Sequence, residues 1–332
     1  MPTLDQRDVV ARLRAIQLDI RTALREHMRR QEPAVWSRTV RDDAGDTIFD
    51  IDAEVERILL RHCSEWGETQ HFTLLAEGLD PAGLRFGRPG LGGPPFRLLV
   101  DPIDGTRGLM FDKRSAWCLM GAAPDRGAAT RLAEVEVAVM TELPTTRMAS
   151  CDVLWASAGG VAHGERHDLH GGSTRPLSLV PSQATTLRHG FASVSNFFQG
   201  GKELIARLEE AIVGRALGGW NAAKAEVYND QYICSGGQLA EVMLGRDRFV
   251  LDVRPLVHQK LGVASSLACR PYDVVTASIA QAAGCVVCDP FGEALDAPFD
   301  TETNVSFACY ANPKLAALLI PIVREEVRRH LG

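Results

Sequence analysis

The sequence is poor in the features that mark several classes of protein. Its 332 residues include eight cysteines, which are too sparse for a disulfide scaffold and are expected to be reduced thiols. No apolar run approaches the roughly 20 residues that are needed to span a bilayer. The N-terminal residues lack the basic segment, apolar core and small-residue cleavage site of a signal peptide. We therefore expect a cytoplasmic protein that has no membrane partner.

Positive charge is not in excess either. The chain has 36 lysines and arginines against 42 aspartates and glutamates, so its formal net charge is −6. That balance argues against a nucleic-acid polymer as the partner. Apolar residues make up 45% of the chain and charged residues 23%, as in soluble globular proteins, and the length suffices for about two domains. We expect the protein to act on small molecules.

The most informative stretch is Asp101-Pro-Ile-Asp-Gly-Thr106, which directly follows the apolar run 96–100. An apolar run that ends in Asp-Pro predicts a buried strand that stops at Asp101, because Pro102 cannot continue a sheet ladder. Asp101 and Asp104 would then face one cleft. Two like charges about 4 Å apart repel by roughly 4 kcal/mol at an effective dielectric of ~20. Mg²⁺, which binds through carboxylates and substrate phosphate, would offset that repulsion.

Two residues that follow these acids favour a phosphate ligand. Gly105 and Thr106 would supply backbone N–H groups at a turn, a geometry that accepts a phosphate oxygen. An Asp-rich surface turn is the ordinary alternative for such a pattern. The complete string, however, is expected by chance in only about one in ten thousand chains of this length. The sequence therefore predicts a metal and phosphate site.

The same string resembles the DPxDGT signature of the inositol monophosphatase superfamily. These are lithium-sensitive, Mg²⁺-dependent phosphatases that include fructose bisphosphatases and 3′-phosphoadenosine phosphatases. The resemblance implies an α/β fold, with α+β and α/β portions in which helix and sheet layers alternate. It covers roughly residues 40–110 and 230–312, and the part between matches only in its order of elements.

A second matching segment is 45–54, which resembles the family pattern G-D-x-x-T-x-x-D before a helix. The resemblance places Asp52 where the family keeps an aspartate that orients the attacking water. An aspartate at a helix start is otherwise an ordinary cap. Phe49 departs from the pattern, because the family usually has threonine there.

Two further acids complete the resemblance. Glu77 follows the apolar run 72–76, where the family has a metal-binding glutamate within G-E-E or S-E-E, and Gly78 replaces the second acid. Asp273 follows Tyr272 in a string similar to the family's W-D-x-x-A-G helix and E-A-G-G turn. Its aspartate is a metal ligand in the family, although a helix cap is the ordinary alternative for an aspartate at such a position.

The resemblance implies a role for each of these residues. Glu77, Asp101 and the Ile103 carbonyl would hold one Mg²⁺, and Asp101, Asp104 and Asp273 a second, with two or three ions in all. Glu77, Thr106 and Asp52 would be catalytic, the last two aligning and deprotonating the water. The expected substrate contacts are Asp104, Gly105, Thr106, Ser235 and Asp252. Ser235 lies in a segment similar to the family's G-S-A helix. Asp252 follows the expected strand 249–251 and would contact substrate hydroxyls.

The pattern of elements predicts two domains. Apolar residues recur at helical intervals over the first thirty residues and indicate a long amphipathic helix. Residues 159–176 are polar and glycine-rich, which indicates a linker. We expect an N-terminal α+β domain over 1–165 with the Asp101–Thr106 site, and a C-terminal α/β domain over 166–332 that supplies Asp273 and substrate contacts. Residues 254–270 form a longer loop than the compact family members have.

The resemblance implies a Mg²⁺-dependent phosphomonoesterase that hydrolyses an inositol phosphate or related sugar phosphate with a metal-activated water. It also implies lithium inhibition and often a homodimer. A sugar bisphosphatase and a 3′-phosphonucleotide phosphatase of the same superfamily remain open. So does a non-catalytic member that binds metal or ligand, because Phe49 and Gly78 depart from the family pattern.

Overall fold

A computed structural model describes residues 4–30, 39–43, 46–219, 221, 223–264 and 267–332, with the backbone alone for 39–43 and 46–51. Its contacts divide the chain into two compact units. The first unit comprises Met1–Ser178, Arg270–Ile279 and Ala297–Thr303, and the second Leu179–Cys269, Ala280–Asp296 and Asn304–Gly332.

We expected the boundary between residues 165 and 166, whereas the first unit continues to Ser178. The expected linker instead forms a hairpin of β9 (His163–Asp168) and β10 (Thr174–Pro176) that extends the sheet of the first unit. Asp273 also belongs to the first unit and not to the second. The chain therefore leaves the first unit and returns to it twice.

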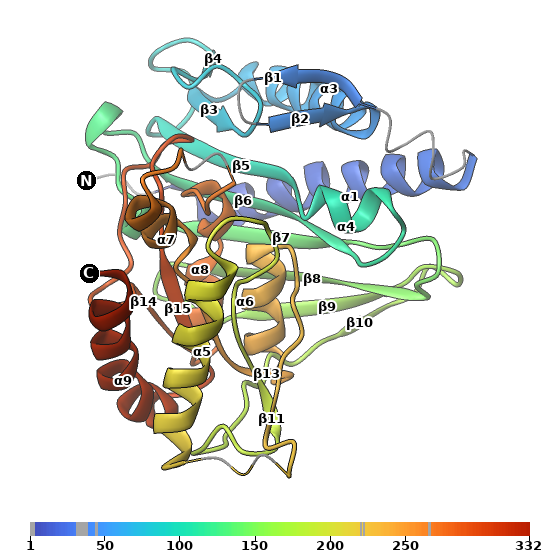
Figure 1. The fold of residues 1–332 in the computed structure, drawn as a ribbon. Helices are drawn as coiled ribbons and strands as arrows, with labels where there is room; N and C mark the ends of the chain where they lie inside the picture. Colours follow the sequence, from blue (N-terminus) through green and yellow to red (C-terminus); the bar gives the residue numbers. More distant parts are fainter. Residues whose placement is uncertain (1–3, 31–38, 44–45, 220, 222, 265–266) are drawn as a thin grey trace. The chain divides into compact units, whose positions relative to one another are not determined.

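The first unit is built on an eight-stranded sheet in the order β10-β9-β8-β7-β6-β5-β3-β4 (Figure 1). The pair of β3 and β5 is parallel and every other neighbouring pair is antiparallel. The strands are β3 (Phe72–Ala76), β4 (Leu84–Phe86), β5 (Phe96–Asp104), β6 (Ala116–Pro124), β7 (Val137–Leu143), β8 (Ser150–Ser157), β9 (His163–Asp168) and β10 (Thr174–Pro176).

Helix α1 (Gln6–Arg30) confirms the helix expected over the first thirty residues. Its buried stripe packs on β7, where buried Gln17 donates from Nε2 to the Val139 carbonyl (2.9 Å) and accepts from Thr141 Oγ1 (2.7 Å). These bonds fix the position of the helix along the strand.

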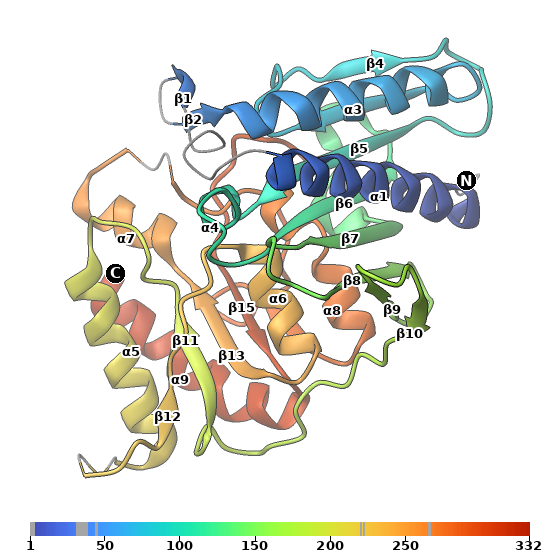
Figure 2. The same ribbon diagram turned by 90° about the vertical axis from the view of Figure 1, so that its right-hand side faces the viewer.

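The other elements of this unit are the hairpin β1 (Thr39–Asp43) and β2 (Asp46–Phe49), helix α3 (Asp50–Gly67) beside α1 (Figure 2), α4 (Thr106–Met110) and the 3₁₀ turns Gly127–Ala129, Leu132–Glu134 and Tyr272–Val274.

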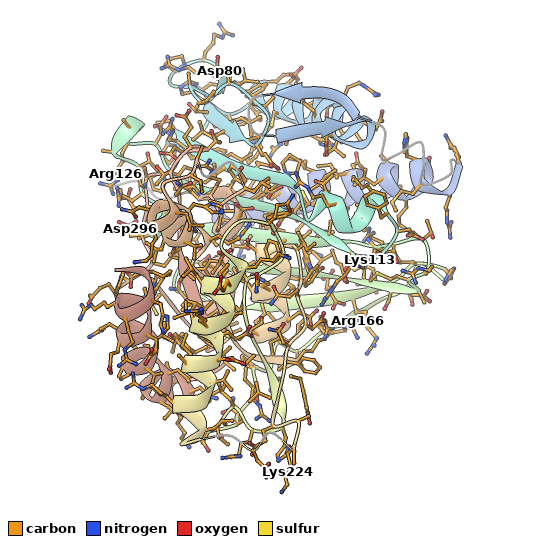
Figure 3. All side chains as sticks on the ribbon, in the orientation of Figure 1. Asp80, Lys113, Arg126, Arg166, Lys224 and Asp296 are labelled. Atoms are coloured by element: carbon orange, nitrogen blue, oxygen red, sulfur yellow. The ribbon has the colours of Figure 1, made fainter. Side chains whose placement is uncertain are left out.

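Charged side chains distinguish the surface of this unit from its interior. Asp80, Lys113 and Arg126 are exposed, and Figure 3 shows Asp80 and Arg126 at the outline of the ribbon. Arg166, on β9, instead pairs with buried Asp152, with N–O distances of 2.6 and 2.7 Å. A buried carboxylate needs such a cationic partner because burial removes its hydration.

The second unit contains a five-stranded sheet in the order β12-β11-β13-β15-β14. Helices α5 and α9 pack together on one face, and α6 packs on the other (Figure 2). Its elements are β11 (Gly190–Val194), α5 (Lys202–Leu217), β12 (Val227–Tyr228), α6 (Ser235–Met243), β13 (Asp247–Asp252), α7 (Arg254–Leu261), β14 (Val286–Cys288), β15 (Phe307–Tyr310) and α9 (Pro313–Leu331), with α8 (Ala277–Ala282) beginning in the first unit.

The expectation of a long loop over 254–270 was wrong for its first half. Residues 254–261 form helix α7, with Pro255 in the first turn and Gly262 closing the helix at a φ of 64°. Both residues suit those positions, since proline is preset for a first turn and glycine tolerates positive φ. None of the helices in the described parts of the chain is long and apolar enough to cross a membrane.

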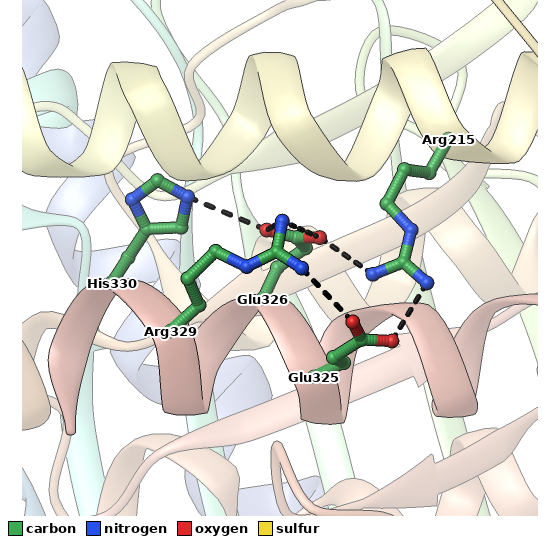
Figure 4. A network of polar contacts seen from close by, with 5 residues as sticks. All are labelled: Arg215, Glu325, Glu326, Arg329 and His330. Carbon is green, nitrogen blue, oxygen red and sulfur yellow. Dashed lines mark hydrogen bonds and ion pairs between the residues drawn. The ribbon is translucent and has the colours of Figure 1, made fainter.

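A buried carboxylate joins α5 to α9 in the second unit (Figure 4). Glu326 has no exposed surface, and its carboxylate accepts from Arg215 of α5 at 2.6 Å and from Arg329 at 3.1 Å. His330 lies 3.4 Å from the other oxygen. Glu325, on the exposed side, binds the same two arginines. The cations offset the cost of burying Glu326 between the helices.

Candidate metal centre

The site begins where β5 passes its expected end. Asp101 pairs with Leu119 of β6 and Asp104 with Trp117, so the β5 segment is one residue longer than its partner segment. This is a β-bulge, in which an extra residue re-aims the side chains around it. Pro102 lies inside the bulge, where its missing N–H breaks no regular ladder. The expectation that the strand stops at Asp101 was therefore wrong, and both aspartates belong to one strand.

Glu77 is brought to Asp101 by the parallel pairing of β3 and β5. Ala76 lies opposite Val100, so Glu77 and Asp101 occupy the next positions on the two strands. The Glu77 N–H donates to the Val100 carbonyl at 3.1 Å and continues the ladder by one bond. The two carboxyl groups lie within hydrogen-bonding reach of each other. Carboxyl ends of neighbouring parallel strands meet at one edge of a sheet, which explains the approach.

Asp273 comes from the 3₁₀ turn Tyr272–Val274, which packs against β5 and β6. Its carboxylate accepts from the Arg270 N–H at 2.5 Å, and its own N–H donates to the Arg270 carbonyl at 3.1 Å. Carboxylate oxygens of Asp101, Asp104 and Asp273 lie within 4.8 Å of one another. All these residues belong to the first unit.

The mutual repulsion of the acids in this cluster favours binding of a cation. Burial, followed by the charges of Glu77, Asp104 and Asp273, raises the pKa of Asp101 well above its usual range. Burial, followed by the charges of Glu77, Asp273 and Asp101, raises the pKa of Tyr272 as well. Converging oxygen donors that resist ionisation together are the ligand set of a hard divalent ion, which reverses their mutual repulsion. The residues present therefore fit Mg²⁺.

The chain turns directly after Asp104. Gly105 has a φ of 95°, a left-handed conformation that costs little only for glycine. Thr106 then opens α4, and its Oγ1 donates to the Ile103 carbonyl at 2.8 Å. A carbonyl oxygen has two lone pairs, so the Ile103 oxygen keeps one for a further partner. The turn thus joins a hydroxyl, a carbonyl and two carboxylates within six residues.

Solved structures of known proteins have this arrangement of elements. The Thermotoga maritima IMPase matches 99% of this chain and 100% of its own, at 16% identity and a TM-score of 0.61. The Leishmania major fructose-1,6-bisphosphatase matches 97% and 99%, at 12% identity and 0.65, and Mycobacterium tuberculosis SuhB 97% and 98%, at 16% and 0.60. The chain has the inositol monophosphatase fold. The sequence itself matches no family model and no curated protein, and at these identities the likeness establishes the fold alone.

The predicted α/β class is confirmed by the inositol monophosphatase fold. The two departures from the family pattern are of different kinds. Gly78 has a φ of 79°, so a second acid at that position would adopt a strained backbone. The side chain of Phe49 lies outside the described residues, as does Gly45, whereas Asp52 lies in the first turn of α3 and is partly buried.

The expected substrate contacts Ser235 and Asp252 belong to the second unit of the inositol monophosphatase fold. Ser235 is buried at the start of α6, where Cys234 Sγ accepts from the Gly237 N–H at 3.2 Å. Asp252, at the end of β13, has no exposed surface. The carboxylate of Asp252 is therefore buried, whereas the expected contact with substrate hydroxyls requires an accessible oxygen.

Arg254, which sequence reasoning missed, binds the Asp252 carboxylate directly. Its Nε and Nη2 donate at 2.9 and 2.6 Å to Asp252 Oδ2, and its backbone N–H donates to Oδ1 at 3.0 Å. Nη1 reaches the Leu267 carbonyl at 2.6 Å, and the guanidinium lies 4.5 Å from the Phe197 ring. The Asp-x-Arg spacing was a usable signal, since an arginine two residues after a buried acid can fold back on it.

Proposed function

We propose that this chain is a Mg²⁺-dependent phosphomonoesterase that hydrolyses an inositol phosphate or a related sugar phosphate. The observation that carries the proposal is the convergence of Asp101, Asp104 and Asp273 to within 4.8 Å in the first unit. Its support is the fold, because solved structures with this fold are titled IMPase and fructose-1,6-bisphosphatase. Two unrelated observations, a ligand set and a fold, thus point to one chemistry.

The chain offers ligands for two ions. Glu77, Asp101 and the Ile103 carbonyl would hold one Mg²⁺, and Asp101, Asp104 and Asp273 the other. Bound Mg²⁺ would supply water activation and neutralisation of charge on the leaving oxygen. Asp101 stands in both sets because its carboxyl group interacts with Glu77 and with both of the other aspartates.

The remaining roles belong to side chains and backbone groups at the turn. Thr106 Oγ1, anchored on the Ile103 carbonyl, aligns the attacking water together with Asp52, which accepts its proton. The N–H groups of Gly105 and Thr106 hold the phosphate. The water would attack phosphorus directly while the P–O bond to the substrate alcohol breaks and that alcohol takes up a proton, so no covalent phosphoenzyme forms.

The second unit contributes substrate contacts through Ser235 and Asp252. Because Asp252 is fully buried and bound by Arg254, its contribution to substrate binding runs through the arginine that it orients. Lithium inhibition, a homodimer and a cytoplasmic location are further parts of this proposal.

Two substrate classes compete with inositol phosphates within the proposal. A sugar bisphosphate is one, since fructose-1,6-bisphosphatase has the same fold. A phosphonucleotide is the other, because a neighbouring structure with this fold is titled as binding 2′AMP. A non-catalytic role in metal or ligand binding is the alternative outside enzymes, and turnover decides between them.

The test is release of inorganic phosphate from a panel of inositol phosphates, sugar bisphosphates and phosphonucleotides, with Mg²⁺ and with excess chelator. We expect turnover only with Mg²⁺, and a loss of about a hundredfold or more in Asp104→Asn, since one metal ligand is replaced by a neutral amide. Asp80→Asn, at an exposed turn of the same unit, is the matched control and should keep full activity. Metal binding without turnover on any substrate would instead establish the non-catalytic role.

A further inference from the structure

Gly121 lies in the middle of β6, opposite Leu99 of β5 and Ala138 of β7. Its φ is not positive, so no backbone strain requires glycine there. Space does require it. A Cβ atom at this position would lie 2.3 Å from Val275 Cγ2 and 3.3 Å from the Val275 carbonyl oxygen. A contact of 2.3 Å between carbon atoms is far inside the optimum of about 3.5–4.0 Å.

Val275 is two residues beyond Asp273 and ends the 3₁₀ turn that carries this acid. It is almost fully buried, and the turn packs against β5 and β6. The segment is short, since only Arg270–Ile279 returns to the first unit at this point. The Arg270 side chain, at the start of the segment, binds the Glu302 carbonyl. The height of the segment above the sheet is therefore set by the contact of Val275 with Gly121.

The same sheet carries the other ligands. Asp101 lies on β5 opposite Leu119, and Leu119 is two residues from Gly121 on β6. The distance from Asp273 to Asp101 thus depends on how closely the turn approaches β6. Metal ligation tolerates errors of about 0.2 Å in ligand distances, so a small rise of the turn removes Asp273 from a shared ion.

We infer that Gly121 is a positioning residue of the metal centre, which lets Val275 pack close enough to the sheet for Asp273 to join Asp101 and Asp104. The inference rests on the proposed function, because it assigns Gly121 a role at the proposed Mg²⁺ site. Gly121 touches neither metal nor substrate. It acts only by allowing the 270–279 segment to pack closely against the sheet.

The test compares Gly121→Ala, Val275→Ala and the double variant by calorimetric titration with Mg²⁺ or Mn²⁺, with phosphate release as a second readout. Gly121→Ala is expected to weaken metal binding by about tenfold or more, because the added methyl group pushes the turn outward. The double variant should recover to within about threefold of the wild type, since removal of Cγ2 clears the space again. Gly93→Ala, where the nearest atom lies 3.7 Å from the added Cβ, is the matched control.

The outcomes separate this inference from the proposed function. A wild-type protein that binds no divalent metal refutes both. Tight binding by the wild type and equally tight binding by Gly121→Ala refutes the positioning role and leaves the proposed function intact. If Gly121→Ala does not fold, as judged by circular dichroism, the double variant decides: folded with binding near that of the wild type supports the inference, and folded with binding weakened about tenfold contradicts it.

Discussion

Replacement of Asp101 by asparagine is expected to abolish phosphate release and, in metal-free buffer, to stabilise the protein. Asp101 is buried among three other acids, so a neutral isostere removes an unfavourable charge. We expect the free energy of unfolding to rise by about 1–2 kcal/mol without metal, because a carboxyl group without a cationic partner is costly to bury. Activity should fall by about a thousandfold or more, since the residue belongs to both proposed ion sites. Urea unfolding and phosphate release measure the two effects.

A second buried aspartate provides the matched control. Asp152 is equally buried but is paired with Arg166, so Asp152→Asn should destabilise the protein and leave metal binding unchanged. Mg²⁺ should raise the melting temperature of the wild type and of Asp152→Asn, and leave that of Asp101→Asn nearly unchanged. An Asp101→Asn variant that is less stable than the wild type in metal-free buffer would contradict the electrostatic account of the cluster.

Replacement of Arg254 by methionine is expected to cost about 3–5 kcal/mol of unfolding free energy, because it leaves a buried carboxylate without its partner. Asp252 has no exposed surface, and Arg254 supplies the side-chain donors described above. The Leu267 carbonyl loses its donor in the same variant. Equilibrium unfolding in urea measures the loss.

The double variant Asp252→Leu/Arg254→Met is the control for this prediction. It removes both charges and is expected to recover most of the lost stability. Asp252→Asn then tests the substrate role, since loss of the charge that orients Arg254 predicts a raised KM together with a loss of stability, as expected for Asp152→Asn. Wild-type stability in Arg254→Met would contradict the pairing.

Two acids of the site, Glu77 and Asp101, were recognisable in the sequence because each follows an apolar run. The apolar run before each acid belongs to a strand that is buried on both faces. Their parallel register then brings the two acids to one edge. The motif added Asp104, and the similarity to the W-D-x-x-A-G string added Asp273. The metal role of Asp101 and Asp104 followed from local pattern, whereas that of Glu77 and Asp273 required the resemblance to the family.

Other features depend on contacts that no local pattern encodes. The bulge at Pro102 follows from pairing with β6, which comes after α4 in the chain. The return of Asp273 to the first unit is a property of the whole contact map. Gly121 has no signal of its own, because a glycine in a strand indicates a close approach without naming the partner. Helix α7 was missed although Pro255 and Gly262 mark its two ends.

The most direct test of the account is a crystal soaked in Mn²⁺, with the ion located by anomalous diffraction. The account predicts at least one peak about 2.0–2.2 Å from carboxylate oxygens of Asp101, Asp104 and Asp273, with Glu77 on the ion nearest Asp101. A crystal in which no ion binds these carboxylates at millimolar Mn²⁺ would contradict it.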